Sequence, residues 1–167
     1  MKKPTFSGAW ILSFLSIASN AWAAEPGFCV GLNKQVDRWQ TYLEKLGAPA
    51  LKDPAGILAY GNAVTNGNER LLEARHKTDV STIFVANPDG DFIRVVTSVP
   101  DGVPRSRQVA VGTTLTRNGD AWTALTQGSP YCGTVTLFGS NFDSIYRPIL
   151  ENNTVIGALY VGNAPPN

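Results

Sequence analysis

The sequence predicts one α+β domain, because helical and extended patterns occupy different parts of the chain. Before Ser81 the apolar residues recur at helical spacing, and after it apolar and polar residues alternate between clusters of turn residues. Helices followed by an antiparallel sheet are typical of the α+β class. A chain of 167 residues is long enough for one such domain with its own core.

The first 23 residues are predicted to be a secretory signal peptide. Lys2 and Lys3 precede an apolar run at 9–18, and residues 21–23 (AWA) have the small-x-small pattern of a cleavage site. The alternative is an uncleaved membrane anchor, but the run is shorter than the roughly 20 apolar residues that span a bilayer. We therefore expect an exported, periplasmic protein with no stable membrane insertion after cleavage.

Three helical segments are predicted before the sheet. The strongest spans 33–46, where Asn33 can cap the start and Gly47 can end the helix. Its apolar face should pack on the core and consists of Val36, Trp39, Leu43 and Leu46. Weaker helical patterns follow at 54–64 and 66–76.

The rest of the chain predicts strands and one short helix. Residues 81–99 read as a hairpin around the turn NPDG, and 109–115 as a short extended piece. Residues 120–126 predict a helix whose Trp122 and Leu125 turn inward. The last three predicted strands are 131–139, 141–150 and 154–162.

No motif in the sequence points to catalysis, so we expect no enzyme and no cofactor. The G-x-S-x-G and H-E-x-x-H patterns are missing. Asp89, Asp91 and Asp143 are interpreted as turn formers that bond the backbone, and NPDGD lacks the acidic spacing of a calcium loop. The single histidine, His76, is expected to be exposed at a helix end, which leaves no metal site.

Net charge and cysteine content argue against several further classes of function. Cleavage of the leader leaves a nearly neutral chain, which gives no electrostatic case for nucleic acid or an anionic membrane. Cys29 and Cys132 lie in no CxxC motif, so redox catalysis and covalent haem have no support. In an oxidising compartment the pair most often forms a disulfide. Two free buried thiols and an intermolecular bridge are the alternatives.

Arg94 is the residue that the strand pattern leaves unexplained, because it lies in the middle of an apolar strand. Strict alternation divides that strand into one face with Phe92, Arg94 and Val96 and another with Ile93, Val95 and Thr97. The Arg94 face could also collect Tyr131 and Tyr146, and a guanidinium with two phenols can hold a small carboxylate. Spacing alone favours another interpretation, a solvent-facing or cross-strand ion-paired arginine.

The order of these motifs resembles the periplasmic sensor domains of the Cache superfamily, in particular the Cache 3/Cache 2 fusion type. The resemblance rests on TIFVANPDGDFIRVVTSV, then AVGTTL, then YCGTVTLFGSNFDSIYRPILENNTVIGALYVG, and predicts a single Cache domain over 33–163. It implies a PAS-like fold, with about five antiparallel strands and a long N-terminal helix. It also implies that a small organic ligand binds over the sheet.

The resemblance assigns roles to individual residues. Arg94 matches the family's strand arginine, Tyr131 the tyrosine of P-Y-x-G and Tyr146 that of Y-x-P, and we expect all three to contact the ligand. Arg107 and Trp122 lie in the stretch that closes over the ligand. Cys132 departs from the family pattern, but alternation puts it on the face opposite Tyr131, where a Cys29–Cys132 bridge would join the N-terminal helix to the sheet. The expected partner is a membrane sensor kinase, chemoreceptor or transporter, and the alternative is a structural scaffold that binds no small ligand.

Overall fold

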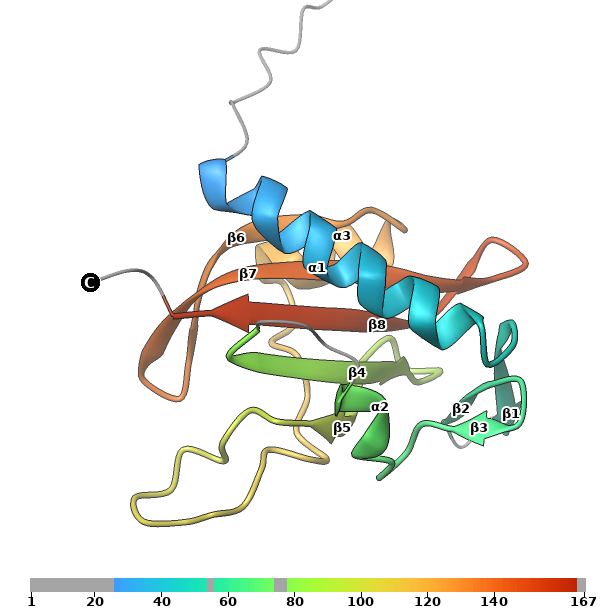
Figure 1. Ribbon diagram of the computed structural model, residues 1–167, viewed down its shortest axis with the longest axis horizontal. Coiled ribbons are helices and arrows are strands. Elements are labelled where there is room, and N and C mark those ends of the chain that lie inside the picture. Colours follow the sequence, from blue (N-terminus) through green and yellow to red (C-terminus); the bar gives the residue numbers. More distant parts are fainter. Residues whose placement is uncertain (1–25, 54–55, 74–77, 165–167) are drawn as a thin grey trace, which may run out of the picture.

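The computed structural model describes residues 26–53, 56–73 and 78–164, which form three helices and two antiparallel sheets (Figure 1). The helices are α1 (Gly27–Glu44), α2 (Arg70–Glu73) and α3 (Asp120–Thr126). The small sheet contains β1 (Pro49–Asp53), β2 (Ile57–Tyr60) and β3 (Ala63–Val64). The large sheet contains β4 (Val80–Ala86), β5 (Phe92–Thr97), β6 (Tyr131–Leu137), β7 (Ser140–Glu151) and β8 (Thr154–Asn163). The predicted signal peptide and His76 lie outside the described residues.

The α+β class and the five-stranded antiparallel sheet are confirmed. The strand order is β5-β4-β8-β7-β6, so three hairpins and the β4–β8 pairing build the sheet. In Figure 1, α1 crosses one face over β7 and β8, and α3 lies behind the other face. The sheet therefore separates two apolar clusters, one under α1 and one under α3.

Helix α1 is longer than its sequence pattern predicts. It begins at Gly27, directly after Pro26, and not at Asn33. Cys29 and Leu32 extend the buried stripe by more than a turn, so packing lengthens the helix beyond the expected cap. Leu46 lies past the helix and is 38% exposed, so its predicted place on the buried face is wrong.

The helix predicted at 54–64 is wrong, because the described part of this segment forms β2, β3 and a turn. A short apolar run such as Leu58–Tyr60 fits a helix or a buried strand equally well. Gly61 has φ +59°, and a Cβ there would overlap the carbonyl oxygen of Leu46. This close approach fixes a turn in place of the expected helix. Of the third predicted helix, only α2 is described as helical.

A β-bulge in β5 overturns the strict alternation expected for that strand. Ile83 pairs with Val96, but the next residue, Phe84, pairs with Arg94, so Val95 is the extra residue. Val95 and Val96 both join the cluster under α1. Thr97, which pairs with Thr82, consequently lies on the face of Arg94.

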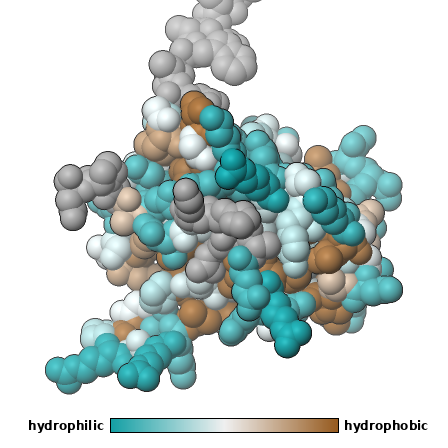
Figure 2. Space-filling model, viewed as in Figure 1, coloured by the Kyte–Doolittle hydropathy of each residue, from teal (hydrophilic) through white to brown (hydrophobic). Residues whose placement is uncertain are grey.

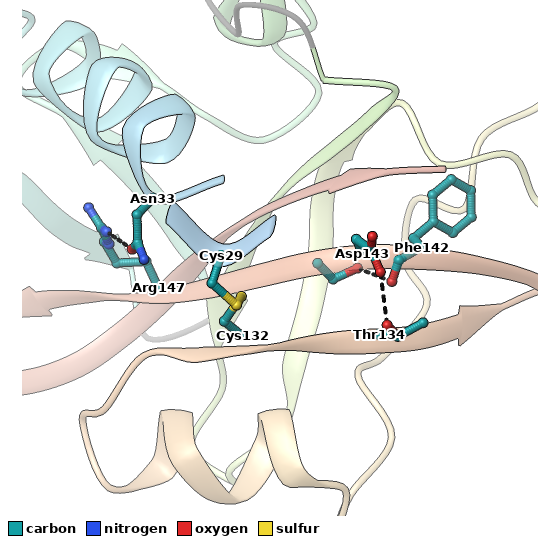
Figure 3. The surroundings of a disulfide bond; sticks show 8 residues. Cys29, Asn33, Cys132, Thr134, Phe142, Asp143 and Arg147 are labelled. Atoms are coloured by element: carbon teal, nitrogen blue, oxygen red, sulfur yellow. Dashed lines mark hydrogen bonds between the residues drawn. A yellow bond between two sulfur atoms is a disulfide. The ribbon is translucent and has the colours of Figure 1, made fainter. Parts of the chain in front are cut away.

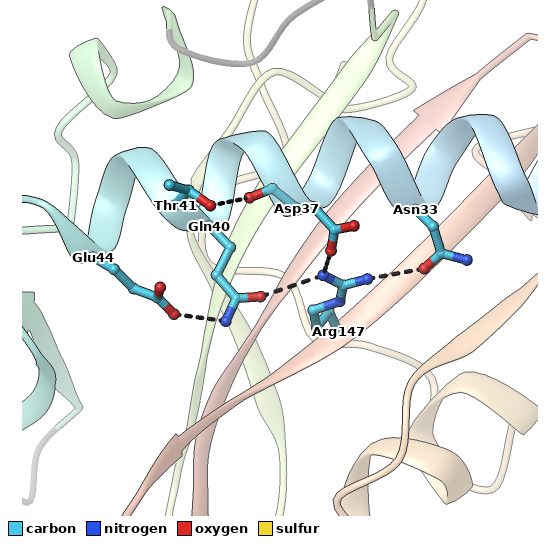
Figure 4. A network of polar contacts seen from close by, with 6 residues as sticks. All are labelled: Asn33, Asp37, Gln40, Thr41, Glu44 and Arg147. Atoms are coloured by element: carbon cyan, nitrogen blue, oxygen red, sulfur yellow. Dashed lines mark hydrogen bonds and ion pairs between the residues drawn. The ribbon is translucent and has the colours of Figure 1, made fainter.

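The start of α1 is fastened to β6 and β7 in two ways. The Cys29–Cys132 disulfide joins residues 103 apart in sequence, with their Cα atoms 6.0 Å apart (Figure 3). It lies on the face opposite Tyr131, as strand alternation predicts. Arg147 on β7 adds polar contacts to the same helix, donating to Asn33 and pairing with Asp37 (Figure 4).

Candidate functional site

Arg94 is buried in the face of the sheet that α3 and the 98–119 connection cover. It is 4% exposed, and its Nη1 donates to the Thr113 hydroxyl at 2.9 Å and to the Thr114 carbonyl at 3.4 Å. The bulge that follows in β5 leaves its orientation as predicted, toward the aromatic cluster. The buried Nε has no hydrogen-bond partner among the described residues.

No carboxylate in the described part of the chain compensates this guanidinium. The ion pairs found there are Arg117–Asp91 and Arg147–Asp37, and neither involves Arg94. Burial lowers the pKa of Arg94, while the charges that Tyr146 and Tyr160 would carry oppose the shift. An arginine nevertheless remains protonated in proteins. The predicted alternative of a solvent-facing or ion-paired arginine is therefore wrong.

A row of aromatic rings lies beside Arg94. Its guanidinium carbon is 4.9 Å from the centroid of the Phe84 ring, a cation–π distance. The Phe84 centroid lies 6.2 Å from that of Tyr146, which is in turn 6.2 Å from Tyr131 and 4.7 Å from Tyr160. Arg94, Tyr131 and Tyr146 thus share one continuous surface of the sheet.

The phenols in this row are neutral at physiological pH and serve as uncharged hydrogen-bonding groups. Burial raises the pKa of Tyr160 to about 12 and that of Tyr146 still further. The Tyr160 hydroxyl lies 3.3 Å from the Ser144 hydroxyl. A Cβ at Gly133 would overlap the Tyr131 hydroxyl, so this glycine lets the Tyr131 ring lie along β6.

A cavity of about 260 Å³ opens against the Tyr131 end of this row. It lies between α3, β6 and the segment before α3, and its lining includes Tyr131, Tyr146, Trp122, Leu115 and Thr116. Arg94 is not part of this lining. Segment 113–116 separates the two, because its first two residues contact Arg94 and its last two face the cavity.

Segment 113–116 and α3 are fastened to the β4–β5 turn. Arg117 pairs with the Asp91 carboxylate and donates to the Asp89 carbonyl at 2.7 Å, while the Trp122 indole N–H donates to the Gly90 carbonyl at 3.0 Å. The partner Arg117 lowers the pKa of Asp91. Asn87, not Asp91, makes the side-chain bond that closes the turn. These contacts help to hold segment 113–116 in place over Arg94.

Asp143 also differs from its predicted role in a turn. It lies within β7 and accepts a hydrogen bond from the Thr134 hydroxyl on β6, at 2.8 Å (Figure 3). The bond is a cross-strand side-chain contact, which supports the pairing of β6 with β7.

The structure does not bring Arg107 to Arg94. Arg107 is exposed and lines a separate groove of about 800 Å³ beside Glu69, Glu73 and Thr97. Hydrophilic side chains project at the lower left of Figure 2, where Figure 1 shows the 98–112 loop, beside some hydrophobic ones. Trp122, by contrast, lines the cavity and is half-buried.

Sequence reasoning missed three neighbours of Arg94. Phe84 and Tyr160 lie on its face, and Thr113 accepts its hydrogen bond. Strand alternation in β8 carries a signal for Tyr160, because Tyr160 pairs directly with Tyr146. Thr113 could not be found in this way, because 109–115 reaches Arg94 through a long connection.

Among the described residues there is neither a candidate metal site nor a candidate membrane-spanning helix. They contain no group of three or more His, Cys, Asp or Glu side chains placed to hold a metal ion. None of the helices that the structure describes is long and apolar enough to cross a bilayer.

Comparison with known families decides the identity of the fold. Residues 32–165 match the Cache 3/Cache 2 fusion domain. The chain belongs to this family. Cache domains are extracellular or periplasmic sensor domains that bind small molecules in signalling.

This Cache domain was also compared with curated proteins and with solved structures. No curated protein matches the chain. Among solved structures it is similar to the GAF domain from Acinetobacter phosphoenolpyruvate-protein phosphotransferase, with 14% identity and a TM-score of 0.45. The similarity covers 81% of this chain and 80% of that one.

Proposed function

We propose that this Cache domain binds a small organic acid whose carboxylate pairs with Arg94. A separate membrane partner, such as a sensor kinase, chemoreceptor or transporter, would recognise the ligand-bound domain. The observation that carries the proposal is the burial of Arg94 without any carboxylate among the described residues. The family's role in sensing small molecules supports it.

The chemistry of the guanidinium favours an anionic ligand. A buried cation loses its hydration, and an oppositely charged group that also accepts its hydrogen bonds offsets that loss. The Nε of Arg94 is buried and unbonded within the described chain, and it belongs to the edge that a carboxylate can bind in a bidentate manner. Neutral phenols on Tyr146 and Tyr160 could orient the anion without repelling it.

The cavity limits the size of the ligand. About 260 Å³ is slightly below the usual range of small-molecule pockets, so a small metabolite fits better than a drug-sized one. Binding at Arg94 requires segment 113–116 to move, which would join the guanidinium to the cavity. The rest of the ligand would then contact Tyr131 and Trp122.

A thermal-shift screen of the exported protein against small organic acids and amino acids tests the proposal, with Arg94→Met measured in parallel. A ligand at about 100 times its Kd adds about 2.7 kcal/mol of stability, which raises Tm by several degrees in a domain of this size. We expect a shift in the wild type that the variant loses. Equal shifts in both proteins would overturn the assignment of Arg94.

One observation favours a second candidate, a scaffold that binds no ligand. Arg94 donates to Thr113 and Thr114 of its own chain, so it also holds the cover on the sheet. If this were its whole role, no acid in the screen would change Tm. Arg94→Met would then loosen segment 113–116 and lower stability.

A further inference from the structure

The two edge strands of the large sheet differ in whether another segment of the chain pairs with them. The edge of β5 is covered, because Arg94 N–H donates to the Thr113 carbonyl at 2.9 Å and Gly112 N–H to the Arg94 carbonyl at 2.8 Å. The opposite edge is β6, which follows β7 in the strand order. Within the described residues, β6 has no backbone hydrogen bonds to anything except β7.

Strand β6 carries none of the usual protection of an exposed edge. Natural edge strands are blunted by charged side chains, proline or bulges. Residues 121–142 contain no Asp, Glu, Lys, Arg or His, and β6 itself contains no proline. Its register with β7 runs unbroken from Tyr131 to Leu137, so no bulge twists the edge away.

An exposed aromatic ring follows directly after this strand. Phe138 is 49% exposed and adopts φ 48°, a left-handed conformation that is unfavourable for a bulky residue. Its ring lies against Gly102, where a Cβ would collide with it. Phe138 and Gly139 form the two-residue turn between β6 and β7, which accounts for this φ and leaves an apolar ring at the end of the open edge.

Strand β6 is also held ready for pairing. Cys132 is bonded to Cys29 on one side of the sheet, and α3 packs on the other. The hydroxyls of Thr134 and Thr136 bond to Asp143 and Asn141 across the hairpin. A rigid strand loses little conformational entropy when a second strand adds to it.

We propose that β6 pairs antiparallel with β6 of a second copy of this chain. The two five-stranded sheets would then form one continuous sheet about a twofold axis. In a single chain water bonds the outward N–H and C=O groups of this edge, whereas a second strand can bond them in register, and a strand without charges can lie beside its own copy without repulsion. Pairing centred near Thr134 would place Phe138 of each copy beside Pro130 of the other and bury the exposed ring.

The molar mass of the exported protein in solution, measured by light scattering over a wide concentration range, tests this pairing. We expect the mass of two chains for the wild type and of one chain for Thr134→Lys with Thr136→Lys. Thr41→Lys with Thr154→Lys adds the same charge at exposed positions away from β6 and should remain a dimer. A monomeric wild type at every concentration, or a Thr134→Lys/Thr136→Lys variant that stays dimeric, would overturn the proposal.

Hydrogen exchange provides a second readout on the unmodified protein. The outward amides of β6 should exchange slowly in concentrated solution and faster on dilution, while those of β4 and β8 should not change. Fast exchange along the outer edge of β6 at all concentrations would contradict the pairing. This test needs no ligand, so its failure is distinct from failure of the proposed acid binding.

Discussion

Arg94 lies over the ring of Phe84, with its guanidinium carbon 4.9 Å from the ring centroid. Phe84 and Arg94 are direct partners across β4 and β5. Their contact is the main interaction within this strand pair that offsets the cost of burying the Arg94 charge. A cation–π contact contributes roughly 0.5–2 kcal/mol, whereas burying an ion costs several kcal/mol even after relaxation. The hydrogen bonds to Thr113 and Thr114 offset a further part of that cost, at about 1.5–3 kcal/mol each, so we expect Arg94 to give the ligand-free domain little or no net stability.

Replacing Arg94 should accordingly not weaken the ligand-free fold. We expect Arg94→Met to unfold in urea with a free energy equal to or above that of the wild type, because an apolar side chain of similar length removes the buried charge. Arg147→Met is the matched control and should lose about 1 kcal/mol, since Arg147 is bonded to Asn33 and paired with Asp37. A loss in Arg94→Met greater than that in the control would favour the scaffold interpretation.

The Cys29–Cys132 disulfide should contribute much of the stability of the domain. It closes a loop of 103 residues, for which the chain-entropy description gives at most about 4.7 kcal/mol. We expect the paired replacement of both cysteines by alanine to lower the free energy of unfolding by about 2–5 kcal/mol. Reductant should destabilise the wild type by a similar amount and leave the variant unchanged. An equal response of both proteins would show that the bridge is absent in solution.

Buried tyrosines make the fold sensitive to alkali. Burial raises the pKa of Tyr160 to about 12 from its usual value of 10, so the folded state keeps a proton that the unfolded state releases. Stability from this group is complete below pH 10 and decreases as pH rises from about 10 to about 12. We expect the unfolding midpoint to fall across that range, and less steeply in Tyr160→Phe. Parallel curves for the two proteins would show that ionisation of Tyr160 is not the cause of the fall.

The contact between Arg117 and Asp91 should control the movement of segment 113–116. Both groups are partly or largely exposed, so Arg117→Ala should change global stability little. We expect faster hydrogen exchange at the amide of Leu115, which donates to the Phe92 carbonyl. Arg105→Ala removes an exposed arginine with no ion pair in the described chain and should not alter this exchange. Identical rates in the two variants would exclude a role for the Arg117 contact.

Much of the large sheet could be predicted from sequence because its signals are local. The hairpin turns carry Asn, Asp and Gly residues that tolerate positive φ, as Asn152 and Asn153 do between β7 and β8. Regular alternation in β6 and β7 also places Tyr131 and Tyr146 on one face, because neither strand has a register shift before Tyr146.

The remaining features depend on contacts between distant parts of the chain. The bulge at Val95 has no local signature, and it decides that Thr97 shares the face of Arg94. The turn at Gly61 follows from its close approach to Leu46, which no periodicity reveals. The family resemblance implies that Arg107 lies in the stretch that closes over the ligand, but the 98–112 loop carries it to another groove.

Calorimetric titration with the best acid from the ligand screen, and with the uncharged amide of the same acid, tests the central claim most directly. If Arg94 binds the carboxylate, the wild type should bind the acid and both the amide and Arg94→Met should lose about 100-fold or more in affinity, as expected when a buried charge loses its partner. Equal affinity of the wild type for acid and amide, or of Arg94→Met and the wild type for the acid, would contradict it.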